Sequence, residues 1–523
     1  MRQTSEGYNP FPVVRSPGVV MTFQVLSTTI TKPQITITSN KTAKLGSPGA
    51  ALNGVPNLAR KFATLEKFGW PLDGSCFLLP DSGVETGFWP NIVSGADGSF
   101  ATPVTVTCVL PKPIHTLGWT FHFDTKTWIF APTVRAVCYD DEDTEMDDYT
   151  GDVRVDDNDS ANGWQLVHSV SGYSKVEFTF YGTNEPYRYM RLVEIDFGLS
   201  RSYGTDTIGE VNLEYELALD GSALPAKKLT FTFDNHDKEF NVLDPIDVYQ
   251  YWRSGQAVTA SIKIGDEYVH MGTFMIARAE IGENYLTAKA TAYDQVRQLG
   301  SQKFYPGTLA EQTSVTLQTA VEKVLDGYGL TVNYNGLEDE PVSVQIKDTH
   351  EKRAVLWYLA QAARASVWID RDDVVQIKRL AVKETPDAEL TAEALYDWSG
   401  VSIAEEVTGV TLNVEHELDE EAQMDIYTSG SPDTEGDTAA SYSNPCVAPG
   451  QGQDVADWLL TAANWAKLYA VKNRCDPAVE IGDTYKIADV FGNDDSAVVT
   501  GLDITYNGVL SSVVKAAGEF END

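Results

Sequence analysis

Basic residues are scarce in this sequence. Its 523 residues include 39 Lys and Arg against 76 Asp and Glu, which leaves a formal net charge of −37 at pH 7. A surface that binds nucleic-acid phosphates needs an excess of Lys and Arg, so specific nucleic-acid binding is excluded as the main task. The acidic excess favours solubility and opposes contact between copies, but by itself it identifies no partner.

Cysteine is also rare, and its spacing excludes two kinds of site. The chain has five cysteines and no CxxC pair that could bind zinc or carry out redox chemistry. We interpret Cys76, Cys108, Cys138, Cys446 and Cys475 as buried thiols, with a disulfide as the alternative.

Long apolar runs are missing. No segment approaches the roughly 20 apolar residues that a membrane-spanning helix needs. The N-terminal sequence MRQTSEGYNPFPVVRSPG lacks the apolar stretch of a signal peptide. We therefore expect no membrane span, and synthesis and folding in a cytoplasm. With 42% hydrophobic and 11% aromatic residues the chain can bury real cores, and its length predicts about three or four domains.

The common catalytic motifs do not occur. The sequence has no GxSxG, P-loop, GxGxxG or HExxH, so the usual hydrolase, nucleotide-binding and zinc-protease functions lose their support. Its seven histidines are scattered, and we interpret them as structural. The acid pairs Glu405-Glu406 and Asp372-Asp373 could in principle serve glycoside hydrolysis, but pairs arise by chance among 76 acids. We therefore expect that the protein is not an enzyme and that it has no catalytic residue, no metal and no cofactor.

The first half of the chain has the pattern of a β-sandwich. Short alternating or apolar runs, separated by turn residues, lie at 104–110, 119–123, 134–139, 175–180 and 190–198. Such spacing is typical of a sandwich. An earlier alternating run at 34–38 predicts a further strand, and residues 198–208 are the best linker candidate.

Residues 140–160 form an acidic segment with eleven carboxylates. A solvated loop is the favoured interpretation. Calcium is the alternative, because Asp156, Asn158 and Ser160 stand at alternate positions as in an EF-hand loop. The match fails at Ala161, where the sharp turn requires Gly, and no Glu closes the loop.

The second half combines patterned strands with amphipathic helices. Strands are predicted at 227–235, 258–265 and 285–294. Helices are predicted at 314–328, with Ser314 or Thr316 as N-cap, at 353–365 and at 453–470. The remaining predictions are a strand, polar turn and strand at 367–380, a loop at 428–452, and a closing β unit at 478–517.

A group of aromatic residues offers a candidate saccharide site. Phe88, Trp89, Trp119, Trp128 and Trp164 could stack on sugar rings at the rim of the sandwich. Core packing is the alternative for most of them. Trp164 follows the Asn-Gly pair of SANGW and could lie at a loop edge, so it is the one residue predicted to contact a saccharide.

The order of motifs over residues 229–299 resembles the tail hub proteins of bacteriophages, the tail-tip or tail-associated family whose core is like the baseplate hub of contractile tails. The segments are LTFTFDNHDKEFNVLDP, VTASIKIGDEYVHMGTFMIARAEI and YLTAKATAYDQVRQL. Asn235, Gly265-Asp266, Gly272-Thr273-Phe274 and Asp294 stand in the family's order. The two following helices, the 367–380 hairpin and AVEIGDTYKIAD continue the resemblance over about 300 residues.

The N-terminal part resembles a discoidin-like, galactose-binding-type β-sandwich that is inserted near the start of such proteins in siphophages of Gram-positive bacteria. The segments that carry this likeness are TLEKFGWPLDGS, TGFWPNIVSGADGSFATP and PYRYMRLVEIDFG. The insertion would interrupt the first hub domain, which would begin near residues 34–38 and resume near Ile208.

These resemblances imply an architecture and a set of partners. The fold class expected is mainly β with some α+β: β-barrel-like hub domains, a discoidin-like sandwich and a few amphipathic helices. The expected regions are N-terminal loops and the first hub strand (1–80), the sandwich (81–200), the first hub β domain (201–300), an α/β hub domain (301–385), and a second hub β domain with a C-terminal helix and β unit (386–523).

The resemblance further implies a homotrimer that closes the tail tube in the virion and is assembled in the host cytoplasm. Its partners would be the distal tail protein, the tail tube, the tape-measure protein and receptor-binding proteins. A lumen lined by carboxylates would repel DNA. No lytic domain follows the hub-like part, which argues against lytic activity. The alternative is a saccharide-binding adhesin that uses the sandwich to recognise host cell-wall glycan.

Overall fold

The computed structural model divides the chain into two compact units. Unit 2 comprises residues 22–202 and is inserted into unit 1, which comprises residues 1–21 and 203–523. The structure describes the whole chain except residues 1–3, 5–7, 13–14, 27–33, 56–57, 59–60, 63–65, 68–75, 77–84, 156–162, 237–254, 266, 283–284, 348, 392, 397–399, 417–422, 433–437, 489–493 and 519–523. The chain is mainly β with a few helices, as predicted.

Unit 2 is built on long, bent strands around an aromatic core. Its strands are β2 (Thr36–Ser39), β3 (Ala43–Leu45), β4 (Trp89–Pro90), β5 (Ser99–Phe123), β6 (Thr133–Tyr139), β7 (Glu145–Asp152), β8 (Arg154–Val155), β9 (Trp164–Gly182), β10 (Leu192–Asp196) and β11 (Gly198–Tyr203), and a short 3-10 helix, η2, spans Pro48–Leu52. The main sheet has the order β10-β5-β9-β6-β7, with β2 on β5 and β8 on β9. The β5–β9 pairing shifts register between Val109 and Gly118, and such bulges bend a strand.

The core of unit 2 explains why its strands alternate. Phe121 and Trp119, from β5, meet Phe178 of β9 edge to face, with ring centroids 5.1 and 5.5 Å apart. All three rings are fully buried. Edge-to-face packing of this kind adds to the free energy gained by burying the rings.

Three expectations for unit 2 differ from the structure. The predicted runs at 104–110 and 119–123 form one strand, β5. The acidic segment is largely a strand, because β7 pairs antiparallel with β6. The 34–38 strand does not open unit 1: β2 pairs with β5, and β1 (Gly18–Leu26) begins in unit 1.

The boundary between the units at 202/203 falls within the predicted linker, residues 198–208, of which Gly198–Tyr203 form the strand β11.

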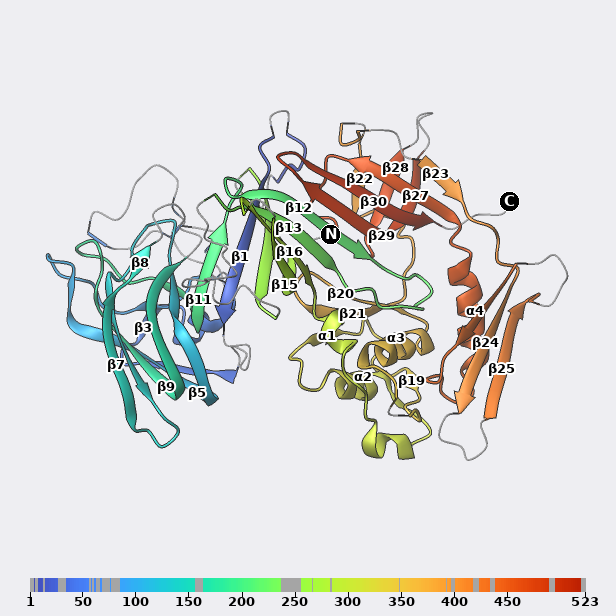
Figure 1. Cartoon of the computed structure of the whole chain (residues 1–523), viewed down its shortest axis with the longest axis horizontal. Coiled ribbons are helices and arrows are strands. Elements are labelled where there is room, and N and C mark those ends of the chain that lie inside the picture. Colours follow the sequence, from blue (N-terminus) through green and yellow to red (C-terminus); the bar gives the residue numbers. More distant parts are fainter. Residues whose placement is uncertain are drawn as a thin grey trace. The chain divides into compact units, whose positions relative to one another are not determined.

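One large sheet organises unit 1 (Figure 1). Its strand order is β11-β1-β14-β15-β16-β13-β12-β29-β30-β27-β23, and β28 pairs with both β22 and β29. The strands β1 and β11 cross the sequence boundaries between the two units. The bounds are β12 (Ile208–Glu216), β13 (Lys228–Asp234), β14 (Ala257–Ile264), β15 (Glu267–Ile281), β16 (Thr287–Tyr293), β22 (Ala388–Leu390), β23 (Gly400–Ile403), β27 (Lys467–Asn473), β28 (Thr484–Ala488), β29 (Asp494–Tyr506) and β30 (Leu510–Gly518). The sheet thus joins strands from both ends of the unit's sequence.

The strands predicted from alternation in unit 1 are present. In β13, Leu229, Phe231 and Phe233 are buried, and the residues between them are partly exposed. In β16 the buried positions are alanines, which let the neighbouring strands' larger side chains fill the interior. Alternation of this kind follows from the two-residue period of a strand.

A helical module follows the first group of sheet strands. It contains α1 (Val296–Leu299), η5 (Gly307–Glu311), β17 (Val315–Thr316), α2 (Leu317–Leu325), β18 (Thr331–Asn333), β19 (Pro341–Val342), α3 (Lys352–Ala362), β20 (Ser366–Ile369) and β21 (Val374–Lys378). Helix α2 begins at the predicted cap, where the Thr316 hydroxyl accepts from the Thr319 amide. Gly327 follows the helix with φ of 88°, which favours glycine.

The remaining elements form a small sheet covered by a helix, seen beside the module in Figure 1. The strands are β24 (Gly409–His416), β25 (Gln423–Gly430) and β26 (Ala439–Ser443), and the helix is α4 (Gly452–Ala463). Two predictions fail here. The region 428–452 includes β26, and α4 ends at Ala463, because residues 467–473 pair with β30 as β27.

The five cysteines are free thiols. Four of them are buried and Cys76 is partly exposed. Burial raises the pKa of the Cys138 and Cys475 thiols to about 12 each, so both stay protonated at neutral pH. The prediction of thiols rather than disulfides is confirmed, and burial is confirmed for four of the five.

Candidate functional site

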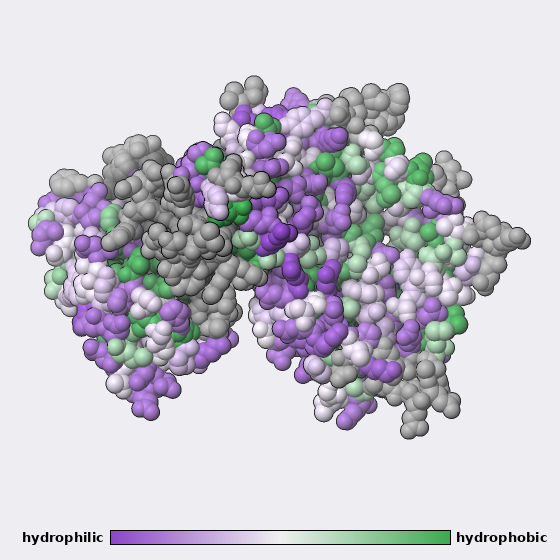
Figure 2. Space-filling view, in the orientation of Figure 1, coloured by the Kyte–Doolittle hydropathy of each residue, from purple (hydrophilic) through white to green (hydrophobic). Residues whose placement is uncertain are grey.

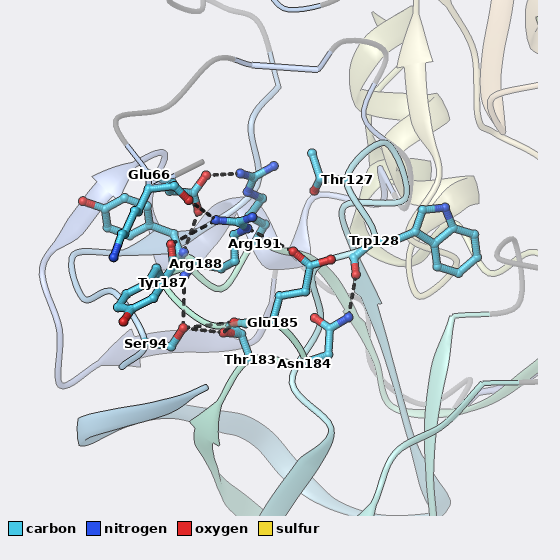
Figure 3. A network of polar contacts seen from close by, with 12 residues as sticks. Glu66, Ser94, Thr127, Trp128, Thr183, Asn184, Glu185, Tyr187, Arg188 and Arg191 are labelled. Carbon is cyan, nitrogen blue, oxygen red and sulfur yellow. Dashed lines mark hydrogen bonds and ion pairs between the residues drawn. The ribbon is translucent and has the colours of Figure 1, made fainter. Parts of the chain in front are cut away.

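A buried ion triad anchors the polar network of unit 2 in Figure 3. The Arg191 guanidinium donates from Nη2 to Glu66 Oε2 and from Nη1 to Asp124 Oδ2, the latter at 3.1 Å. The side chains of these three residues are at most 3% exposed. Arg191 also lies 4.5 Å above the Trp89 ring. Two buried carboxylates thus share one cation, which also lies over an aromatic face.

A second set of contacts orders the segment that leads to Arg191. The Thr183 hydroxyl donates to Ser94 Oγ at 2.7 Å, and Ser94 Oγ accepts from the Arg188 amide at 3.0 Å. The Arg188 guanidinium donates to Glu185 Oε2 and to the Lys67 carbonyl. The Lys67 ammonium lies 4.4 Å from the Tyr187 ring. These contacts join segments far apart in the sequence.

Trp128 is held in the open by its backbone. Its amide donates to the Asp124 carbonyl at 3.0 Å. Its carbonyl accepts from Asn184 Nδ2 at 2.9 Å, and the Asn184 side-chain oxygen accepts from the Phe130 amide at 3.0 Å. The ring points away from the network in Figure 3 and is 47% exposed. The fold therefore fixes the position of an exposed indole.

Two residues of this network adopt strained backbone conformations. The φ angles of Trp128 and Tyr187 are 55° and 60°. Left-handed conformations are costly for large side chains and persist where the surroundings enforce them. Such strain gathers at functional sites, which makes the surface around Trp128 the candidate binding site of unit 2.

Trp164 lies in the core and is 1% exposed. Its ring packs against Phe123, Trp128 and Phe130, with centroid distances of 5.3, 6.2 and 5.4 Å. It has no face open to a sugar. Phe88, Trp89 and Trp119 are fully buried as well. Of the five aromatic residues considered from the sequence, the exposed one is Trp128, which rests against Trp164.

The other sequence candidates do not converge on a site. His122 is buried and bonded to Asp196 at 2.9 Å, and His168 stacks on Tyr149 while bonded to Asp147. Among the described residues no group of His, Cys, Asp and Glu could hold a metal ion. The calcium candidates Asp156, Asn158 and Ser160 lie outside the described residues. No described helix has the length and apolar character needed to cross a membrane.

Strand β23 forms a bare edge of the large sheet in unit 1. It pairs with β27 and with no other described strand. All four of its residues are exposed; Val401 is 56% and Ile403 64% exposed, and Leu468 of β27 beside them is 42% exposed. Figure 2 shows apolar surface in this region. No local pattern in the sequence predicts this exposed edge, because the exposure of a four-residue strand depends on its place at the edge of the sheet.

Comparison with known proteins finds a distant likeness in structure. No family model and no curated protein matches the chain. The tail protein of Neisseria meningitidis MC58 is 10% identical with a TM-score of 0.43, and 61% of this chain covers 93% of that one. The 43 kDa tail protein of prophage MuSo2 from Shewanella oneidensis is 13% identical with a TM-score of 0.42, covering 60% and 94%.

A third similar structure is prophage tail protein gp18 from Listeria monocytogenes EGD-e. It is 10% identical with a TM-score of 0.39, and the likeness covers 62% of this chain and 92% of that one. All three structures are thus named as tail proteins, two of them of prophages.

Replacing Arg191 by Met should destabilise unit 2 by about 3–5 kcal/mol, because it leaves Glu66 and Asp124 as buried charges without their cation. Hydrogen exchange of the slowest β9 amides in the intact chain measures this loss. The matched control is Arg135→Met, which breaks the bidentate pair with Asp148 whose side chains are 40% and 38% exposed. The control should cost far less, because an exposed ion pair contributes little to stability. Equal losses in the two variants would contradict the role of the triad.

Proposed function

We propose that this chain is a structural protein of a phage tail, which closes the end of the tail tube as a homotrimeric hub and docks to the distal tail protein. It would lie at the distal end of the virion tail after assembly in the host cytoplasm. Its further partners would be the tail tube, the tape-measure protein and receptor-binding proteins. In this function the chain is not an enzyme and needs no cofactor.

The sequence resemblance and the fold of unit 1 support the proposal. The motifs around Asn235, Gly272-Thr273-Phe274 and Asp294 follow the order of tail hubs. In the structure these motifs lie on or next to β13, β15 and β16, adjacent strands of the large sheet. Unit 2, residues 22–202, is inserted into unit 1, and the resemblance implies an inserted sandwich over residues 81–200.

The bare edge at β23 is the observation that carries the assembly role. Proteins blunt such an edge by keeping it short or with Lys, Pro or a bulge. Gly400–Ile403 is four residues long and has no Lys, Pro or bulge, and its apolar side chains are exposed. Because each chain carries a net charge of −37, two copies of the chain repel one another, and this repulsion is weakest at an uncharged part of the surface. The uncharged β23 is such a place, and its occupant would be a second copy of this chain.

Introducing Lys at both Val401 and Ile403 should prevent the trimer from forming. The two ammonium groups oppose burial of the strand edge against a neighbour, so association should be lost at the concentrations where the wild-type chain assembles. Light scattering over a range of concentrations checks this. The wild-type chain should approach three times the 57.4 kDa mass of one chain, whereas the variant should remain at one.

Val509→Lys is the matched control for the edge variant. Val509 is 60% exposed and lies between β29 and β30 rather than along a free strand. This variant should assemble like wild type. A trimer that survives both edge substitutions, or a wild-type chain that is monomeric at every concentration, would contradict assembly through β23.

Saccharide binding by unit 2 is the second candidate function, and the exposed Trp128 favours it. An indole fixed by its backbone and nearly half exposed offers a flat apolar face on which a sugar ring can stack. The saccharide contact predicted for Trp164 would then be made by Trp128, and the buried Trp164 ring would pack against it from below. The ligand would be a host cell-wall glycan, and the chain would act as an adhesin.

Binding of the intact chain to a cell-wall glycan array should be lost in Trp128→Ala, by at least about tenfold in affinity, because the stacking face is removed. Tyr181→Ala is the matched control, since Tyr181 is an exposed aromatic residue of β9 in the same unit. The control should bind like wild type. No glycan bound by wild type, or unchanged binding by Trp128→Ala, would contradict this function.

A further inference from the structure

The tip of the β20–β21 hairpin joins the helical module to the large sheet of unit 1. Tyr215 of β12 donates its hydroxyl to the Ile369 carbonyl at 2.5 Å. Lys227, just before β13, donates from Nζ to the Asp370 carbonyl at 2.7 Å. Both contacts hold backbone carbonyls of the hairpin, so the tip is fixed by donors that come from the sheet.

Arg371 ties the same tip to a third segment. It is 1% exposed, and its guanidinium donates to the carbonyls of Pro477 and Val479, the latter at 2.6 Å. Residues 477–479 precede β28. The turn between β20 and β21 thus lies where the module, the first strands of the sheet and the C-terminal strands meet.

Ionisable groups are buried at this junction without full hydrogen bonding. Lys227 and Asp294 are 0% and 1% exposed. Asp294 Oδ1 accepts from the Val296 amide. Asp294 Oδ2 and Asp373 Oδ1 are enclosed and accept no hydrogen bond from the protein. A buried carboxylate oxygen without a partner is costly, whereas the protonated acid costs far less.

The charges that face these two acids come from several elements. Lys227 faces both Asp294 and Asp373, which also face each other. Asp370 and Asp372 raise the pKa of Asp373 from the same turn, and the Thr273 hydroxyl of β15 lowers it. Arg371 lowers and Asp370 raises the pKa of the Lys227 ammonium. Glu480 raises the pKa of the Tyr215 hydroxyl. The junction therefore holds more carboxyl groups than cations.

Desolvation favours the protonated form of both acids, of which Asp294 is buried and Asp373 is partly exposed. Desolvation raises the pKa of Asp294 to about 6, and Lys227 opposes the rise. Desolvation likewise raises the pKa of Asp373 to about 6. Burial lowers the pKa of the Lys227 ammonium, so this cation compensates the acids less than an exposed lysine would.

We propose that the tip of the β20–β21 hairpin is a latch between the helical module and the large sheet, closed when Asp294 and Asp373 carry protons and loosened when both are ionised. This inference rests on the geometry of the junction and holds whether or not the chain is a tail hub. The latch would let the module be released from the sheet within unit 1 without any covalent change.

The direction of the effect follows from proton linkage. An acid with a higher pKa in the closed latch than in the open one binds its proton more tightly when closed. Closure is therefore favoured at low pH, and this advantage is lost as the pH rises from about 4 to above 6. Each acid can change the closing equilibrium by up to about 100-fold, because the pKa values differ by about two units.

Hydrogen exchange of the intact chain tests the latch. Peptides covering β20 and β21 should lose protection by more than about tenfold between about pH 4.5 and 7.5, after correction for the intrinsic exchange rate. Peptides of α2, in the same module but without buried acids, are the internal reference and should keep constant protection. A wild-type hairpin whose protection changes no more than that of α2 would overturn the proposal.

The double variant Asp294→Asn, Asp373→Asn keeps the shape of the protonated acids and cannot ionise. Asn also suits the φ of 60° at Asp373. This variant should remain closed across the range, with α2 protected as in wild type. Asp339→Asn, which removes an exposed acid elsewhere in the helical module, is the matched control and should retain the wild-type pH dependence. A full pH dependence in the double variant would also overturn the proposal.

Discussion

The antiparallel pairing of β12 with β29 is the interaction on which unit 1 depends. It joins Val211 to Tyr506 and continues to Glu216 opposite Gly501. Asn212 reinforces the pairing by donating to Asp503 at 2.9 Å. Without this pair the first and last groups of strands would be two sheets with open edges. Closing so long a stretch of chain is entropically expensive, and the merged sheet repays this cost by burying both groups of strands in one interior.

The helical module depends on this pairing through the hairpin tip. Tyr215 lies in β12, and Val479 precedes β28, which pairs with β29. Tyr215 donates to the Ile369 carbonyl, and the Val479 carbonyl accepts from Arg371. The tip can touch all three segments because the sheet places them together. The cost is that Lys227, Asp294 and Arg371 are buried, which makes the junction sensitive to the protonation of its acids.

Local signals in the sequence predicted the elements that depend on local physics. The Thr316 cap and Gly327 placed α2 correctly. The apolar stripe of α4 continued to Leu468, but pairing of Leu468 with Ala517 in β30 made that segment a strand. The acids of β7 suggested a loop, yet Asp148 is paired with Arg135 of β6. In both cases a distant strand decided the structure, and its position cannot be read from a local pattern.

At the candidate site too, local sequence patterns did not predict which side chains are exposed. Trp164 follows a turn signal but begins β9, where its pairing with Phe121 turns the ring inward. Trp128 is exposed through contacts with Asn184, and Arg191 meets Glu66 across 125 residues. In that triad both carboxylates have a shared cation, so its charge stabilises one loop geometry. At the hairpin tip two carboxyl oxygens have no partner, so the same kind of burial leaves an equilibrium that a proton can shift.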